Sequence, residues 1–204
     1  MTKIYDQTTT GLLLVDFYND FLAEEGKLYP RTKEVSESVN LLKHLKAIVD
    51  EARKSGIRVF YVPHHRSEPD DYDNWLYPNP NQIKSQKSQP FAKGTWGGEF
   101  HPDFQPQKGD VIAKEHWGSS GFANTDLDHQ LKMHGVQKII IIGMIANTCI
   151  EATARYGSEL GYHVTLVKDA TSAFSKEAMH AAHEINGPTY AHAIVTTEEL
   201  LAAL

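Results

Sequence analysis

Six short apolar runs constrain the fold of this 204-residue chain more than any other feature of its sequence. Their Leu, Ile and Val residues follow one another almost without interruption, whereas a half-exposed strand alternates apolar and polar residues. Strands have this pattern when helices cover both faces of their sheet, which is typical of parallel sheets. The runs lie at residues 12–15, 57–62, 111–113, 138–142, 163–167 and 193–195.

Segments with helical periodicity separate these runs. Between the first two runs, apolar residues recur at helical spacing up to Gly56, which suits the position after a helix end. These residues are Val35, Val39, Leu42, Leu45 and Val49. Further helices are predicted around Leu127, up to Leu160 and from about Ser175. Alternating strands and helices predict a three-layer α/β sandwich, Rossmann-like, with a parallel sheet as its middle layer.

Residues 64–108 differ from the rest, because Pro, Asn, Gln and Trp replace the periodic apolar pattern there. A loop of this length in a compact domain usually forms a lid, a binding loop or an oligomer contact. With 41% hydrophobic and 23% charged residues, the chain has enough apolar material for one sizeable core. We therefore predict a single domain, residues 1–204, with a long loop or lid at about 64–108.

Charge and cysteine content narrow the partners and the compartment. Twenty Lys and Arg against 26 Asp and Glu give a net charge of -6, which argues against nucleic acid and anionic membrane surfaces as partners. The one cysteine, Cys149, has no partner for an internal disulfide, and the first residues lack the apolar core of a signal peptide. These features predict a cytoplasmic protein. No glycine-rich nucleotide-binding motif is present, so no cofactor is predicted.

Three polar residues follow predicted strands at the point where each strand ends. Asp16 follows residues 12–15, Lys114 follows residues 111–113, and Cys149 comes shortly after residues 139–142. Because the carboxyl ends of neighbouring parallel strands meet at one edge of the sheet, we expect these side chains to converge. A carboxylate, an ammonium and a thiol at one site suit nucleophilic catalysis.

The surroundings predicted for Cys149 favour its thiolate. A nearby lysine and a helix N-terminus both lower the pKa of a thiol. Thr148 and Glu151 match a capping box, which would place Cys149 in the first helical turn. Asp16 is predicted to accept the thiol proton, and the backbone N–H groups of Ile145 and Cys149 to bind an oxyanion. The alternative is a buried, purely structural cysteine, which is common for this residue type.

Four segments together resemble the isochorismatase-like cysteine hydrolase superfamily. Residues 14–21 resemble its V-D-x-Q-N-D-F opening, with Tyr18 in place of the usual Gln, and residues 112–122 resemble its lysine strand and the segment after it. Residues 143–150 resemble its G-x-x-x-x-x-C-V turn, and residues 168–170 its later D-A element. The resemblance implies a six-stranded parallel sheet, an Asp16/Lys114/Cys149 triad and a cis peptide between Met144 and Ile145.

The implied activity is hydrolysis of a C–N bond in a small amide, ureide or carbamoyl compound through a thioester. Nicotinamidases of the family hold a metal near the second strand, but here that strand is followed by adjacent His64 and His65 without the Asp-x-His element, so no metal is predicted. Isochorismatase-type hydrolysis of a vinyl ether, in which the cysteine is dispensable, remains an alternative. A second alternative is a non-catalytic binding or effector protein with the same fold.

Aromatic residues near the predicted site are candidates for contact with a small-molecule substrate. They are Phe21, Trp75, Trp96, His116 and Trp117. Loop aromatics can equally anchor the loop or pack against a neighbouring subunit, and the family resemblance implies a homo-oligomer, a dimer or tetramer. His180 and His183, beside Glu184, are interpreted as a partly exposed helix face, since no third ligand of known position accompanies them.

Overall fold

The computed structural model describes residues 4–204 and contains a six-stranded sheet in which every neighbouring pair of strands is parallel. The order across the sheet is β3-β2-β1-β4-β5-β6. The strands are β1 (Thr10–Val15), β2 (Arg58–Val62), β3 (Val111–Ile112), β4 (Lys138–Met144), β5 (His163–Ser172) and β6 (Ala193–Val195). The predicted α/β fold is therefore confirmed, and each predicted strand is present.

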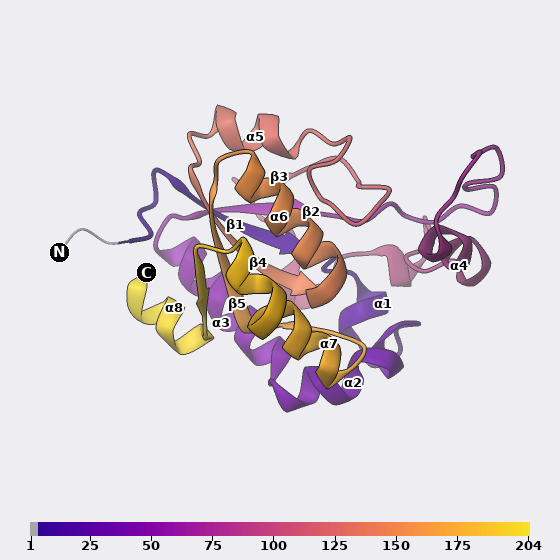
Figure 1. Cartoon of the computed structure of the whole chain (residues 1–204), viewed down its shortest axis with the longest axis horizontal. Coiled ribbons are helices and arrows are strands. Elements are labelled where there is room, and N and C mark those ends of the chain that lie inside the picture. Colours follow the sequence, from indigo (N-terminus) through magenta and orange to yellow (C-terminus); the bar gives the residue numbers. More distant parts are fainter. Residues whose placement is uncertain (1–3) are drawn as a thin grey trace.

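Helices cover both faces of the sheet, and Figure 1 shows α5 on one side of the strands and α2 and α3 on the other. The buried side chains of α3 and α8 pack in one apolar cluster, and those of α5 and α6 pack in another. The helices are α1 (Asn19–Leu22), α2 (Tyr29–Ser38), α3 (Leu41–Lys54), α4 (Pro80–Ser88), α5 (Leu127–Met133), α6 (Glu151–Glu159), α7 (Lys176–His180) and α8 (Thr197–Ala203).

The central strand β1 shows why its sequence is continuously apolar. Leu12 and Leu14 pack in the cluster that contains α3, whereas Leu13 and Val15 pack in the cluster that contains α6. Successive side chains of a strand point to opposite faces, so a sheet with two covered faces needs apolar residues at every position. Within the residues that the structure describes, no helix has the length and apolar character needed to cross a membrane.

The helix predicted over residues 35–49 is in fact two helices, α2 and α3. The chain turns between them at Asn40, whose φ of 50° lies in the left-handed region that Asn tolerates better than most residues. Leu42 belongs to the predicted apolar stripe but is 39% exposed, because the turn shifts the helical phase. The apolar residues keep their helical spacing across Asn40, so the sequence pattern does not indicate that the helix is interrupted there.

The long segment 64–108 is more ordered than its composition indicates. Helix α4 begins after Asn79, and Pro80 occupies its first position. The Asn79 side chain accepts hydrogen bonds from the backbone N–H groups of Asn81 and Gln82, and the Gln82 side chain accepts one from the Asn79 N–H, which completes a capping box. Figure 1 shows α4 at one end of the molecule, far from α8. Helices α1 and α8 were also not predicted, since α1 spans only 4 residues and α8 follows the final strand directly.

The direction of the chain across the sheet changes between β1 and β4. From β1 the chain moves to β2 and β3 on one side, and then returns to β4, β5 and β6 on the other. Ligand sites of open parallel sheets lie beyond the carboxyl ends of the strands at such a switch point. Gly143 lets β4 approach β1 closely here, because its φ is 117° and a Cβ would lie 2.2 Å from the Val15 carbonyl oxygen.

Candidate active site

Asp16 lies at the carboxyl end of β1 and is fully buried. Its φ of 59° is left-handed, a conformation that Asp adopts more readily than bulkier residues. Its backbone N–H bonds to the Val62 carbonyl, and its carbonyl accepts from Tyr18, so both neighbouring segments hold the turn. The turn directs the carboxylate to the edge of the sheet where β1 and β4 end.

The partner of Asp16 is His116. The imidazole Nε2 lies 3.1 Å from Asp16 Oδ1, and both side chains are almost completely buried. Nδ1 of His116 lies 2.8 Å from the Gly118 carbonyl oxygen. The backbone of His116 donates to Pro63 and accepts from His65, which fixes the residue beside the end of β2.

These hydrogen bonds fix the number of protons that the pair shares. A carbonyl oxygen only accepts, so Nδ1 of His116 donates to Gly118. An ionised carboxylate also only accepts, so the contact between Nε2 and Asp16 requires a second proton. Burial lowers the pKa of His116, but the charge of Asp16 and the hydrogen bonds to Asp16 and Gly118 outweigh it and raise the pKa overall. The raised pKa favours the doubly protonated imidazolium of His116 beside Asp16.

The structure corrects the predicted placement of Lys114. Its side chain is exposed, its backbone N–H donates to Asp126, and it lines neither of the cavities that contain Cys149. Tyr61 pairs with Ile112, and three residues later His64 pairs with His116, which is four residues after Ile112. The segment after β3 therefore contains one extra residue relative to the segment after β2. Such a bulge changes which side chains face the site. The imidazole of His116 therefore lies where sequence reasoning placed the ammonium of Lys114.

Cys149 lies in a π-helical turn, Ala146–Ile150, between β4 and α6. The turn begins after Ile145, and Thr148 lies inside it rather than at its cap. The Thr148 hydroxyl contacts the Ile145 carbonyl at 3.5 Å and Cys149 Sγ at 3.9 Å, while the Glu151 carboxylate binds Arg155 and Asn186. The predicted capping box is therefore wrong, because the widened turn moves both residues out of its geometry.

The environment of Cys149 also differs from the predicted one. Burial, and then the negative charge of Asp16, raise the pKa of the thiol well above its ordinary value, against smaller lowering effects of the Thr148 hydroxyl and the Ile145 N–H. The sequence predicted a lowered thiol pKa, since it placed Lys114 nearby. A carboxylate rather than an ammonium faces the sulfur, so the resting group is a neutral thiol.

The three side chains form one compact cluster. One ligand-type atom each from Asp16, His116 and Cys149 lies within 4.8 Å of the other two. The Met144–Ile145 peptide bond is cis. The Ile145 N–H lowers the pKa of the Cys149 thiol, so this backbone group lies near the sulfur.

Cys149 opens into two adjoining cavities. The larger, about 310 Å³, is lined by Asp16, Ile145 and Cys149 at its base and by residues of α4 on another side. The smaller, about 80 Å³, lies between Cys149, Trp117 and the start of α4. A space of this size suits a small organic molecule, with the thiol and the carboxylate at its base.

The five predicted substrate contacts have different positions. Phe21 lines the larger cavity and Trp117 the smaller. His116 is instead the buried partner of Asp16. Trp75 and Trp96 line neither cavity, since Trp75 stacks on Trp117 and Trp96 is held through its carbonyl by Asn19. Trp75 fits the alternative in which a loop aromatic anchors its loop, whereas the side chain of Trp96 is exposed and its residue is held through the backbone.

His64 is a cavity residue that sequence reasoning did not select. It lines both cavities, and its ring packs edge-on against His116. Nδ1 donates to the His65 carbonyl, which leaves Nε2 as an acceptor. Burial and the charge of His116 lower the pKa of His64. His65 points elsewhere, to Asp71, Glu115 and Trp117, as expected for neighbours in an extended segment.

Two cations reach the larger cavity from different helices, Arg31 from α2 and Lys84 from α4. Arg31 packs over the Phe174 ring, and neither cation forms an ion pair with any residue from 4 to 204. Asp16 is the one acidic residue among the described residues of the lining, and His116 neutralises it. The cavity therefore carries a net positive charge, which the sequence alone did not indicate.

The profile of the isochorismatase domain family matches residues 10–199. The chain belongs to the isochorismatase family. It is 27% identical to ureidoacrylate amidohydrolase RutB of Caulobacter segnis, over 95% of this chain and 85% of that protein. It is 31% identical to the protein of the same name from Yersinia enterocolitica, over 82% of this chain and 76% of that one.

Among solved structures, this isochorismatase family chain resembles a cysteine hydrolase from Pseudomonas syringae pv. phaseolicola 1448A. The TM-score is 0.80 at 25% identity, covering 98% of this chain and 93% of that one. N-carbamoylsarcosine amidase from Thermoplasma acidophilum matches with a TM-score of 0.67 at 25% identity, over 93% of this chain and 97% of that one.

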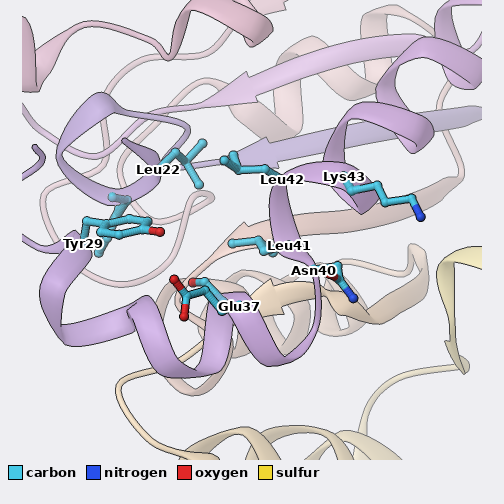
Figure 2. A pocket seen from close by; sticks show the side chains of 9 residues that line it. Leu22, Tyr29, Glu37, Asn40, Leu41, Leu42 and Lys43 are labelled. Atoms are coloured by element: carbon cyan, nitrogen blue, oxygen red, sulfur yellow. The ribbon is translucent and has the colours of Figure 1, made fainter. Parts of the chain in front are cut away.

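A separate cavity of about 310 Å³ lies between α1, α2 and the start of α3 in this family member. Figure 2 shows Leu22 and Tyr29 on one side of it, facing Leu41 and Leu42. Neither Asp16 nor Cys149 reaches it. The clustered thiol, imidazole and carboxylate lie outside it, so the cavities at Cys149 are the candidates for an active site.

Proposed function

We propose that this protein is a hydrolase that cleaves a C–N bond in a small amide, ureide or carbamoyl compound, with Cys149 as nucleophile. The observation that carries the proposal is the cluster of Asp16, His116 and Cys149 at the base of a cavity. A thiol within 4.8 Å of a carboxylate, with a backbone N–H near the sulfur, supplies a nucleophile, a base and a candidate oxyanion donor.

The proposed reaction has two stages. Asp16 accepts the thiol proton, the thiolate adds to the carbonyl carbon, and the N–H groups of Ile145 and Cys149 stabilise the oxyanion. The C–N bond breaks as Asp16 returns the proton to nitrogen, so ammonia or an amine leaves and a thioester remains. Water then attacks the thioester with Asp16 as base, which releases the acid and restores the thiol. His116 keeps Asp16 oriented throughout.

The names of the relatives support a carbamoyl or ureide substrate. The matched proteins of Caulobacter segnis and Yersinia enterocolitica are ureidoacrylate amidohydrolases, and a structural relative is an N-carbamoylsarcosine amidase. We extend this choice of chemistry to the present chain, which shares the fold and carries a cysteine in the family's turn.

The charge of the cavity supports a substrate with a carboxylate group. Arg31 and Lys84 line the cavity that contains Cys149, and neither has an acidic partner among residues 4–204. Charge-assisted contacts with a carboxylate are stronger than contacts between neutral groups. Phe21 and Phe91 supply an apolar wall in the same cavity. A short ureido acid satisfies both features.

The test is ammonia release by the purified protein from a small ureido acid and from the matching alkyl urea, which lacks the carboxylate. We expect turnover of the ureido acid, loss of at least about 1,000-fold in kcat for Cys149→Ala, and no change after treatment with a chelator. Full activity of Cys149→Ala would exclude the thioester mechanism. Turnover of a vinyl ether by that variant, lost in Asp16→Ala, would indicate isochorismatase-type chemistry instead.

The same assay tests the carboxylate contact. Arg31→Gln and Lys84→Gln are each expected to raise KM for the ureido acid by about 10-fold and to leave KM for the alkyl urea unchanged. Lys87→Gln is the matched control, since Lys87 is an exposed cation of the same helix α4 that does not line the cavity. Equal KM values for Lys84→Gln and Lys87→Gln would exclude Lys84 from substrate binding.

We also retain a homo-oligomer and a reducing compartment as proposals. Leu76 and Tyr77, at the tip of the long segment before α4, are 81% and 87% exposed, which supports contact with another subunit. Light scattering after size-exclusion chromatography measures the mass directly. A monomer that remains fully active would exclude a site shared between subunits.

A further inference from the structure

The cluster at the base of the cavity has the donor set of a transition-metal site. A thiolate, an imidazole and a carboxylate are the protein ligands that Zn²⁺ uses, whereas a lysine ammonium has no free lone pair for coordination. His116 beside Asp16 therefore changes the coordination chemistry of the site as well as its acid–base chemistry. The three ligand-type atoms lie within 4.8 Å of one another.

His116 is held in the orientation that a metal ligand needs. Its Nδ1–H donates to the Gly118 carbonyl at 2.8 Å, so Nε2 is the nitrogen directed at the cluster. Metal-binding histidines commonly donate their second ring N–H to a backbone carbonyl in this way. The supporting contact for a bound ion is therefore already formed.

Asp16 supplies a second, independent observation. Its Oδ2 atom is buried and has no hydrogen-bond partner among the described residues. A buried carboxylate oxygen without a partner is costly, and coordination to a cation is one way to satisfy it. Asp16 and Cys149 both line the larger cavity, so an ion can enter from there and a water can complete its coordination.

The distances fit a divalent ion after small side-chain rotations. Tetrahedral Zn²⁺ with one sulfur, one nitrogen and one oxygen ligand needs donor atoms roughly 3.3–3.6 Å apart. The Nε2 to Oδ1 distance is already 3.1 Å, and no donor pair exceeds 4.8 Å. Shifts of about 1 Å therefore suffice to bring the three donor atoms to these separations.

We propose that Asp16, His116 and Cys149 bind one Zn²⁺ ion and that this ion inhibits the enzyme. Binding releases two protons to solvent, that of the thiol and the one between Nε2 and Asp16. The Nδ1–H group of His116 stays protonated and continues to donate to the Gly118 carbonyl. The ion then occupies the nucleophile and the base together. The binding site stands on its own geometry, whereas the inhibition rests on the proposed hydrolase function.

Cobalt provides a test of binding that does not depend on turnover. Co²⁺ chloride is titrated into the purified protein, and the sulfur-to-cobalt charge-transfer absorption is recorded. Cys149 is the one cysteine of the chain, so any such band comes from this residue. We expect a band that saturates at one ion per chain and that Zn²⁺ chloride displaces.

Three variants locate the site. Cys149→Ser is expected to abolish the band, and His116→Lys to weaken Zn²⁺ binding by at least about 100-fold, because an ammonium neither coordinates nor tolerates a nearby cation. His129→Gln is the matched control, since His129 is an exposed histidine on α5. Its Zn²⁺ affinity should equal that of the wild type. Thermal unfolding of each variant checks that it is folded.

Each outcome decides one part of the proposal. A band that His116→Lys removes and His129→Gln keeps, together with Zn²⁺ inhibition that a chelator reverses, supports both parts. Absence of the band in a folded protein that still hydrolyses a ureido acid overturns the metal site and leaves the proposed function standing. A band accompanied by unchanged or increased hydrolysis overturns the inhibitory role. If no substrate is hydrolysed, the cobalt titration still decides the metal site.

Discussion

At the scale of single residues, the imidazole of His116 lies beside Asp16, where the sequence predicted the ammonium of Lys114, and this contact defines the site. Both groups place a positive charge next to the carboxylate, but the imidazolium is planar and is held by the Gly118 carbonyl on its far side. Its charge depends on the second proton that the contact with Asp16 requires. The orientation of the Asp16 carboxylate, which lies within 4.8 Å of the thiol, depends on His116.

Replacements of His116 separate its charge from its hydrogen bonds. His116→Gln keeps a donor for Asp16 but removes the positive charge, so we expect kcat to fall by about 100-fold with a smaller change in KM. His116→Lys restores a charge, so its kcat should lie between those of the Gln variant and the wild type. Steady-state kinetics with a ureido acid measures both. If the Gln variant matches the wild type, the charge on His116 has no role in the reaction.

The sequence analysis named all three clustered side chains, but it assigned His116 to substrate contact rather than to the partner of Asp16. Asp16 and Cys149 follow long buried strands, whose ends are clear from their apolar runs. β3 has only 2 residues, and the inserted residue after it shifts every later side chain. A spacing rule that assumes a regular strand selects Lys114 at that point, and the paired register with β2 shows that His116 is the partner of Asp16.

At the scale of elements, strands were easier to predict than helix boundaries. A strand covered on both faces has an apolar residue at every position, so its sequence is distinctive. The break at Asn40 depends on a single left-handed residue, and α4 has no buried residue. Helix α4 is stabilised by its cap and by polar contacts such as that of Gln82 with the Trp117 carbonyl, so no apolar stripe indicates it.

Asp20 shows how α1 holds the long segment against the site. Its Oδ2 atom accepts from the Phe91 N–H at 2.6 Å, and its Oδ1 atom accepts from the Lys27 N–H at 3.0 Å. Gly97 packs directly against this carboxylate, where a Cβ would lie 2.4 Å from Oδ1. Phe91 lines the cavity at Cys149, so Asp20 positions a wall of the site without touching the substrate.

Removal of this carboxylate should weaken both the fold and substrate binding. Asp20→Ala leaves two backbone N–H groups without a charged acceptor, so we expect the free energy of unfolding to fall by about 3 kcal/mol. KM for the ureido acid should rise because Phe91 is released. Denaturant unfolding and steady-state kinetics measure these effects. Asp103→Ala is the control, since Asp103 is 59% exposed in the same long segment, and an equal loss in both variants would contradict this role.

At the scale of the whole molecule, the order of the strands brings the site together. Asp16 and Cys149 are far apart in the sequence, but β1 and β4 are neighbours and the chain changes direction between them. His116 joins them from beyond β3 through its backbone contacts with the segment after β2. The parallel topology, predicted from the apolar runs alone, is therefore sufficient to place the candidate site at this edge of the sheet, although not every residue in it.

The stability of the molecule is linked to pH through His183, which sequence reasoning placed on a partly exposed helix face. It is only 3% exposed, in the π-helical turn Ala181–Asn186 after α7, and its Nε2 lies 2.8 Å from Thr171 Oγ1 in β5. Burial lowers the pKa of His183 to about 4. The charge of Lys168 adds a smaller lowering effect, and the charges of Glu184 and Glu151 oppose it. The turn rotates this imidazole into the core between the helix and the sheet.

A buried neutral histidine makes the fold less stable in acid. The unfolded chain binds the proton below about pH 6.5, whereas the folded chain resists it until about pH 4, so stability is complete above pH 6.5 and falls through this interval. Between about pH 7.5 and pH 5 the loss should be about 2 kcal/mol. His183→Gln should reduce this loss of stability, as measured by denaturant unfolding at the two pH values. His180→Gln, at the end of α7, is the control and should not reduce it. If the wild type and both variants lose stability equally, the acid sensitivity of the fold arises elsewhere.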